Sequence, residues 1–265
     1  GLVGYRIRTG GETLNVLRWV TENGDARERV IPAELQVLPP FGARNPIVIT
    51  KSEFARSGFT AAHLSGGQFR GYSTMSTFVH EIEMAIKDGE RFVYAYYDGL
   101  DRVGHERGHG AAFDAEYAFV DRLIGDIRDR LDPAVAVVVT ADHGQVHTGD
   151  NVVPIAAAVM RHTRAISGEA RFVWLHSNPG AEALLLEAAR AAHGHDAWVL
   201  SVEQVIGQRL LGGRVSPDAR GRLGEVALIA KSTVALVDPA APESTLIGRH
   251  GSLTADELYV PLLCP

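Results

Sequence analysis

Three short apolar segments alternate with helix-like stretches in the first 142 residues, and this alternation constrains the fold more than any other feature. The segments are NPIVIT (45–50), RFVYAYYD (91–98) and VAVVVTAD (135–142). Each is rich in β-branched or aromatic residues and is bounded by turn residues, which is typical of interior parallel strands. With helices between them, they predict a doubly wound α/β sheet.

The two stretches between these segments carry the apolar period of a helix. Phe78, Ile82 and Ala85 recur at i, i+4 and i+7 behind Ser73 and Thr74, which are candidate N-caps. The second stretch keeps the same period for more than five turns, with Pro133 closing it. Its apolar positions are Phe113, Tyr117, Val120, Ile124, Ile127 and Leu131.

Composition limits the possible partners and ligands. The chain of 265 residues is 46% hydrophobic with a formal charge of −6, which argues against binding of a nucleic-acid polymer. The one cysteine, Cys264, excludes an intrachain disulfide, so any metal must be held by His, Asp and Glu. No apolar run approaches the roughly 18 residues that suggest a membrane span. Localisation is left open, with the cytoplasm slightly favoured, and the oligomeric state is not determined.

The pattern changes after about residue 154. A strand-like RFVWLH (171–176), a helix-like stretch over 181–194, a strand AWVLS (197–201) and a short helix follow one another without an acidic-His motif. We therefore expect residues 155–224 to form a small inserted α+β cap. Residues 1–154 and 225–265 would then form the core domain.

Acidic and histidine side chains follow two of the predicted strands. Asp101 and His105 come just after the segment 91–98, and Asp142 and His143 end the segment 135–142. Ligands of parallel sheets bind beyond the carboxyl ends of the strands, so these pairs should share one edge. Carboxylate and imidazole ligands together suit Zn²⁺. Alone, each motif is more often a local turn, and His250 in RHGS would be an ordinary surface histidine; their combination indicates a metal site.

These motifs together resemble one enzyme family. The sequence D101-R-V-G-H105, the Val120-Asp121 pair, T-A-D142-H143-G144 and H250-G251-S-L-T-x-x-E257-L are similar to the type I phosphodiesterase/nucleotide pyrophosphatase branch of the alkaline phosphatase superfamily. The resemblance runs along the whole chain and is weakest over the predicted cap. It implies an α/β/α sandwich with a mostly parallel central sheet.

The resemblance also implies a two-zinc site. Asp101, His105 and His250 would hold one zinc ion, and Asp142 and His143 would contribute to the second. In the family, a further Asp and a nucleophilic Thr or Ser complete the second site. Both precede the segment that matches Gly1, so we expect the nucleophile upstream of this chain and little turnover without it.

The expected reaction is zinc-dependent hydrolysis of a small phosphorylated substrate through a covalent Thr or Ser intermediate. Phosphodiesters and nucleotide pyrophosphates are the first candidates. A phosphomonoesterase, phosphonate hydrolase, sulfatase or mutase on the same scaffold remains an alternative. So does a truncated, non-catalytic fragment that binds metal.

Overall fold

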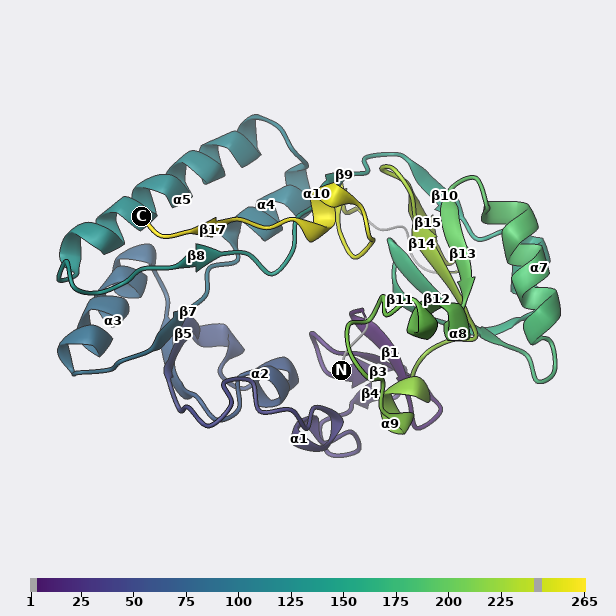
Figure 1. The fold of residues 1–265 in the computed structure, drawn as a ribbon, viewed down its shortest axis with the longest axis horizontal. Helices are drawn as coiled ribbons and strands as arrows, with labels where there is room; N and C mark the ends of the chain where they lie inside the picture. Colours follow the sequence, from purple (N-terminus) through teal and green to yellow (C-terminus); the bar gives the residue numbers. More distant parts are fainter. Residues whose placement is uncertain (1–3, 241–244) are drawn as a thin grey trace. The chain divides into compact units, whose positions relative to one another are not determined.

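The computed structural model describes residues 4–240 and 245–265, and the chain divides into two compact units (Figure 1). Unit 1 comprises Gly1–Asn15, Gly104–His109 and Ala141–Val260. Unit 2 comprises Val16–Val103, Gly110–Thr140 and Pro261–Pro265. None of the described helices is both long enough and apolar enough to cross a membrane.

Unit 1 is built on an antiparallel sheet with the strand order β13-β14-β12-β11-β1-β2. These strands are β1 (Arg6–Thr9), β2 (Glu12–Asn15), β11 (Thr163–Glu169), β12 (Phe172–Ser177), β13 (Ala197–Ser201) and β14 (Val226–Ala230). The expectation of a mostly parallel central sheet is therefore wrong for the largest sheet of the described residues. The connections from β1 to β2 and from β11 to β12 are two residues long, and only antiparallel strands can be joined by so short a turn.

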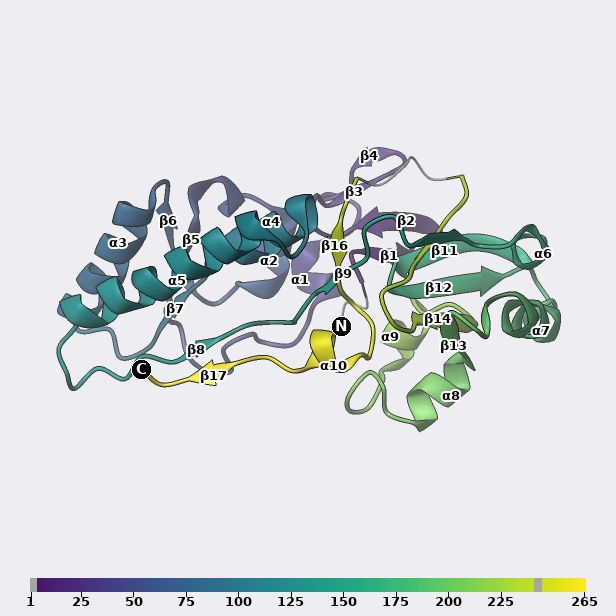
Figure 2. The same cartoon turned by 90° about the horizontal axis from the view of Figure 1, so that it is seen from above.

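The two faces of this sheet are covered by different helices (Figure 2). The helix α7 (Glu182–His193) buries Leu185 and Ala189 in one core together with Leu228 of β14. The helix α8 (Val202–Gly207) buries Val205 in a second core with Ile229 of the same strand. Because neighbouring side chains of a strand point to opposite faces, β14 serves both cores and is buried throughout.

The remaining elements of unit 1 are short. β10 (Val152–Pro154) pairs in parallel with β15 (Ala235–Val237), and β9 (Val146–His147) pairs antiparallel with β16 (Gly248–Arg249). The short helices are α6 (Ala157–Met160), α9 (Pro217–Arg220) and α10 (Ala255–Leu258).

The strands of segment 155–224 lie inside the unit 1 sheet. β11 pairs with β1, and both β12 and β13 pair with β14, so partners come from before and after the segment. The segment is thus hydrogen-bonded both to a strand that precedes it and to a strand that follows it in the sequence. Its treatment as an inserted cap stays a prediction.

Unit 2 contains a parallel sheet with the order β6-β5-β7. Its strands are β5 (Ile47–Lys51), β6 (Gln68–Tyr72) and β7 (Val93–Ala95). The predicted strands at 45–50 and 91–98 are confirmed as the parallel pair β5 and β7. The other elements are β3 (Val20–Thr21), β4 (Gly24–Asp25), α1 (Pro32–Leu35), η1 (Ser52–Phe54), α2 (Gly58–His63), α3 (Met75–Lys87), the first part of α4 (Gly99–Arg107), α5 (Ala111–Arg130), β8 (Val139–Thr140) and β17 (Leu262–Leu263).

The two long helices of unit 2 confirm the helical periods of the sequence. α3 buries Phe78, Ile82 and Ala85 against the parallel sheet, where Leu123 of α5 joins the same core (Figure 1). Thr74 is the N-cap of α3, and its hydroxyl and that of Thr77 form a reciprocal capping box. The caps and the apolar period together determine where this helix begins and which face it buries.

The predicted buried strand at 135–142 is wrong in extent and in pairing. Only Val139 and Thr140 form a strand, and β8 pairs antiparallel with β17. Val138 is 57% exposed. A β-branched run becomes an interior strand only with a hydrogen-bonded neighbour on each side, and in the described part of the chain β8 pairs in a two-stranded sheet with β17.

A buried histidine in β12 predicts how the stability of the fold depends on pH. His176 is 3% exposed, and its Nε2 lies 2.8 Å from the Ser167 hydroxyl. Burial lowers the pKa of His176 from 6.5 to about 4, outweighing the opposing effect of the Glu225 carboxylate. The unfolded chain therefore binds the extra proton first, and stability is lost as pH falls from about 6.5 towards 4.

We expect this histidine to contribute up to about 3 kcal/mol of acid sensitivity in that window. Urea unfolding at a series of pH values should show a shallower loss for His176→Phe than for the unchanged chain. His195→Phe is the matched control, because the His195 side chain is 98% exposed. An unchanged pH slope in His176→Phe would contradict the assignment.

Candidate metal centre

The helix α4 (Gly99–Arg107) carries two of the predicted ligands on one face. Asp101 lies in its first turn and His105 in its last, and residues spaced i, i+4 are neighbours on a helix surface. The helix follows β7 directly, and its first hydrogen bond runs from the Arg102 amide to the Asp98 carbonyl. The Asp98 carboxylate accepts a hydrogen bond from Lys51 Nζ at 2.8 Å, which holds the start of the helix to β5.

His105 is attached to the strand that precedes His250. Its Nδ1 donates to the Gly248 carbonyl at 2.7 Å, although the two residues are 143 positions apart. The Ile247 amide donates to the His105 carbonyl at 2.7 Å. A carbonyl only accepts, so Nδ1 carries the proton and the lone pair of the neutral ring lies on Nε2. These bonds determine the orientation of the imidazole.

The approach of α4 to this strand depends on two glycines. A Cβ atom added to Gly248 would collide with the Gly104 carbonyl, and one added to Gly104 would collide with the side chain of Gln145. The helix backbone thus lies directly on β16 without an intervening side chain. Glycine at these two positions is what lets the His105 and His250 rings approach each other.

One carboxylate and two imidazoles meet as a result. Asp101, His105 and His250 each offer a ligand atom, and these atoms all lie within 4.8 Å of one another. All three side chains are partly buried, and the His105 and His250 rings are 5.2 Å apart. His105 and His250 belong to unit 1, and Asp101 lies one turn earlier on the same continuous helix.

The second predicted pair lies beside this group without forming a ligand set of its own. The His143 ring stacks on the His250 ring with centroids 3.5 Å apart and an interplanar angle of 11°. Asp142 Oδ1 lies 3.7 Å from His143 Nε2, and the Asp142 side chain is 64% exposed. Among the described residues, the Asp101 group is the one set of three or more potential ligands. A second metal ion at Asp142 and His143 stays a prediction.

Two further histidines, His109 and His147, lie in unit 1. The His109 amide donates to His147 Nδ1 at 3.2 Å. Both line a pocket of about 530 Å³ together with Gln145, Asp256 and Tyr259. Neither histidine belongs to the ligand group.

Sequence reasoning missed the residues that hold the two histidine loops in place. Arg171 and Glu257 form a fully buried ion pair whose members are 86 positions apart. Thr254 is the N-cap residue of α10 but makes no side-chain cap hydrogen bond to that helix, and its hydroxyl donates to the Glu257 carboxylate. An arginine beside the apolar run FVWLH was the available signal, since a buried arginine requires a partner.

A family model matches most of the chain. Residues 39–253, more than half of the chain, match the model described as type I phosphodiesterase / nucleotide pyrophosphatase. The match includes all five predicted ligands and confirms the resemblance seen in the sequence. Comparison with curated proteins gave no significant match.

Solved structures show a similar fold at low sequence identity. Murine ectonucleotide pyrophosphatase / phosphodiesterase 5 is 16% identical with a TM-score of 0.63, over 82% of this chain and 60% of that one. The human protein of the same name is 14% identical with a TM-score of 0.65, over 83% and 59%. Phosphonoacetate hydrolase from Sinorhizobium meliloti is 15% identical with a TM-score of 0.63, over 99% and 74%. The chain thus spans about 60% of the length of the ectonucleotide pyrophosphatases that it resembles.

Proposed function

Because the chain belongs to the type I phosphodiesterase/nucleotide pyrophosphatase family, we propose that it hydrolyses small phosphate esters at a metal centre built on Asp101, His105 and His250. Phosphodiesters and nucleotide pyrophosphates are the proposed substrate class. The observation that carries the proposal is the convergence of one carboxylate and two imidazoles, from segments far apart in the sequence, within 4.8 Å.

The donor set fits zinc. One oxygen and two imidazole nitrogens are ligands that Zn²⁺ accepts, and three protein ligands leave a coordination position open, as in catalytic sites. Zinc-binding histidines commonly donate their other ring nitrogen to a carbonyl or carboxylate, and His105 does so to Gly248. We assign Asp101, His105 and His250 to the first zinc ion, and Asp142 and His143 to a second.

The residues of the chain would bind the metal ions, orient the ligands and offset the charge of the metal. When bound, divalent cations there would polarise the phosphoryl oxygens and offset their negative charge. The carboxylates of Asp101 and Asp142 would supply negative charge that offsets the positive charge of the metal. His143, stacked on His250, has its ring plane set by that contact and by Nδ1, which donates to the Gly144 carbonyl at 2.9 Å. The covalent step implied by the family needs a Thr or Ser nucleophile, and we assign no residue of this chain to that role.

A second candidate is hydrolysis of a phosphonate. The similar structure from Sinorhizobium meliloti is a phosphonoacetate hydrolase in complex with phosphonoacetate, and its fold is matched by 99% of this chain. An inactive variant of the murine enzyme was solved in complex with AMP. A phosphonate and a nucleotide monophosphate share an anionic phosphoryl group, so one metal centre of this type could accept either.

A substrate panel separates these candidates. The chain is stripped with a chelator, reconstituted with zinc and assayed against bis(4-nitrophenyl) phosphate, 4-nitrophenyl phosphate, 4-nitrophenyl sulfate and phosphonoacetate. We expect zinc-dependent turnover of the chain alone to be low, because no nucleophile is assigned within it, and to be greatest for the phosphodiester. Preference for phosphonoacetate would favour the second candidate. Absence of zinc binding by the chain would contradict the proposed metal centre, whichever substrate is used.

A further inference from the structure

We propose that the buried Arg171–Glu257 ion pair is a positioning device that holds the His143 and His250 loops in register. It thereby sets the affinity of the metal centre, to which neither side chain contributes a ligand. The inference rests on the proposed function only in that the centre binds a metal.

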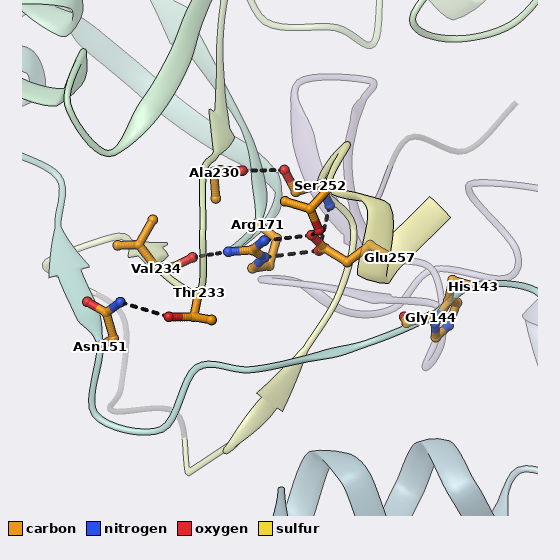
Figure 3. A network of polar contacts seen from close by, with 10 residues as sticks. His143, Gly144, Asn151, Arg171, Ala230, Thr233, Val234, Ser252 and Glu257 are labelled. Atoms are coloured by element: carbon orange, nitrogen blue, oxygen red, sulfur yellow. Dashed lines mark hydrogen bonds and ion pairs between the residues drawn. The ribbon is translucent and has the colours of Figure 1, made fainter. Parts of the chain in front are cut away.

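The Glu257 carboxylate is the hub of this network (Figure 3). Arg171 binds it in a bidentate manner, with Nε to Oε1 at 3.0 Å and Nη2 to Oε2 at 2.6 Å. The Ser252 amide and the Thr254 hydroxyl donate to the same two oxygens. The side chains of Arg171 and Glu257 are 0% and 1% exposed, so solvent does not compete for these bonds.

Glu257 is hydrogen-bonded to both histidine loops. Its Oε1 accepts from the Ser252 amide at 2.9 Å, two residues after His250. Its backbone carbonyl accepts from the Gly144 amide at 2.9 Å, one residue after His143. A Cβ atom added to Gly144 would collide with the Asp256 carbonyl, so the two backbones are in close contact. One residue therefore connects the two loops whose imidazoles stack 3.5 Å apart.

Arg171 and Ser252 anchor the hub in the unit 1 sheet. Arg171 lies between β11 and β12, and its Nη1 donates to the Val234 carbonyl at 2.5 Å. The Ser252 hydroxyl donates to the carbonyl of Ala230, the last residue of β14. These hydrogen bonds attach the histidine loops to the unit 1 sheet, and those donated by Arg171 are charge-assisted.

The charge state of the hub agrees with this role. Burial alone raises the pKa of the Glu257 carboxyl, but hydrogen bonds from Arg171, Thr254 and the Ser252 amide outweigh it, and the pKa lies below its usual value. The carboxylate is therefore ionised at neutral pH and acts only as an acceptor.

Such a pair is poorly explained by stability alone. Removing two charges from water costs free energy that their attraction only partly restores, so an apolar pair of similar volume is often as stable. Fixed bidentate geometry is what an apolar pair cannot supply. We infer that the pair is used to place the two loops.

The test is the zinc affinity of the full chain after Glu257→Gln, measured by competition with a chromophoric chelator. The glutamine keeps the shape of the side chain but turns an amide N–H₂ towards the arginine or the Ser252 amide. We expect affinity to fall about 10-fold or more, as for other residues that support metal ligands. Glu203→Gln is the matched control, since Glu203 pairs with Arg220 at 2.9 Å on the surface and should leave the affinity unchanged.

A second measurement does not depend on metal. In the metal-free chain, the ring protons of His143 and His250 carry ring-current shifts from their stacking, and we expect Glu257→Gln to change them while Glu203→Gln does not. A folded Glu257→Gln chain with unchanged ring shifts and unchanged zinc affinity would overturn the inference. If the unaltered chain binds no zinc, the proposed function fails, and the ring shifts still decide the positioning role.

Discussion

Replacing His250 with Ala is expected to abolish stable zinc binding at the Asp101, His105 and His250 group. The substitution removes one of three ligand atoms that lie within 4.8 Å of one another. Substituting a residue that merely supports a metal ligand typically lowers metal affinity by about 10–100-fold, so loss of a ligand itself should lower it by more than about 100-fold. Elemental analysis after gel filtration should show at least one zinc ion fewer per chain.

His195→Ala is the control for this prediction. His195 is also in unit 1, but its side chain is 98% exposed and pairs only locally with Asp196. Its removal should leave the zinc content unchanged. Equal zinc content in His250→Ala and in the unaltered chain would refute the assignment of His250.

Replacing Arg171 with Met is expected to cause a large loss of stability. The change leaves the Glu257 carboxylate, 1% exposed, without its cation. Removing one partner of a buried ion pair costs about 3–5 kcal/mol, because the remaining charge is desolvated and uncompensated. Urea unfolding of the metal-free chain at neutral pH measures this loss directly.

The double variant Arg171→Met/Glu257→Leu separates charge from packing. With both charges removed, we expect most of the stability of the metal-free chain to return, because apolar pairs of similar volume often replace buried ion pairs without loss. If the single variant loses less than about 1 kcal/mol, water or a rearranged donor must reach the carboxylate, and the burial argument would be wrong.

Local sequence was sufficient for the elements whose stabilising contacts are also local. The apolar period of residues 75–87 and the Thr74 cap specify α3, and the period from Phe113 to Leu131 specifies α5, because spacing and caps act within a few turns. The helix that carries Asp101 and His105 was not expected from the sequence, which placed the pair just after a strand, and their i, i+4 spacing shares one face only because α4 forms there.

The arrangement of strands could not be obtained in this way. The valine-rich run at 135–140 has the composition of an interior strand, yet only β8 forms and it pairs with β17 of the C-terminal segment. Strand composition describes a side chain's fit to a pleated surface, whereas pairing depends on which distant segment supplies the backbone partner. For the same reason the antiparallel order of the unit 1 sheet was not expected.

The sequence by itself determined the family and the candidate ligands: two acidic-His motifs and a distant His250 whose chemistry suits a divalent cation. Only the tertiary structure decided which of these side chains meet. It placed Asp101, His105 and His250 within chelating distance, stacked His143 on His250, and connected both loops through Arg171 and Glu257. The physical reason is that such contacts join residues up to 149 positions apart (Asp101 and His250) and arise from packing of the whole chain, which no local pattern encodes.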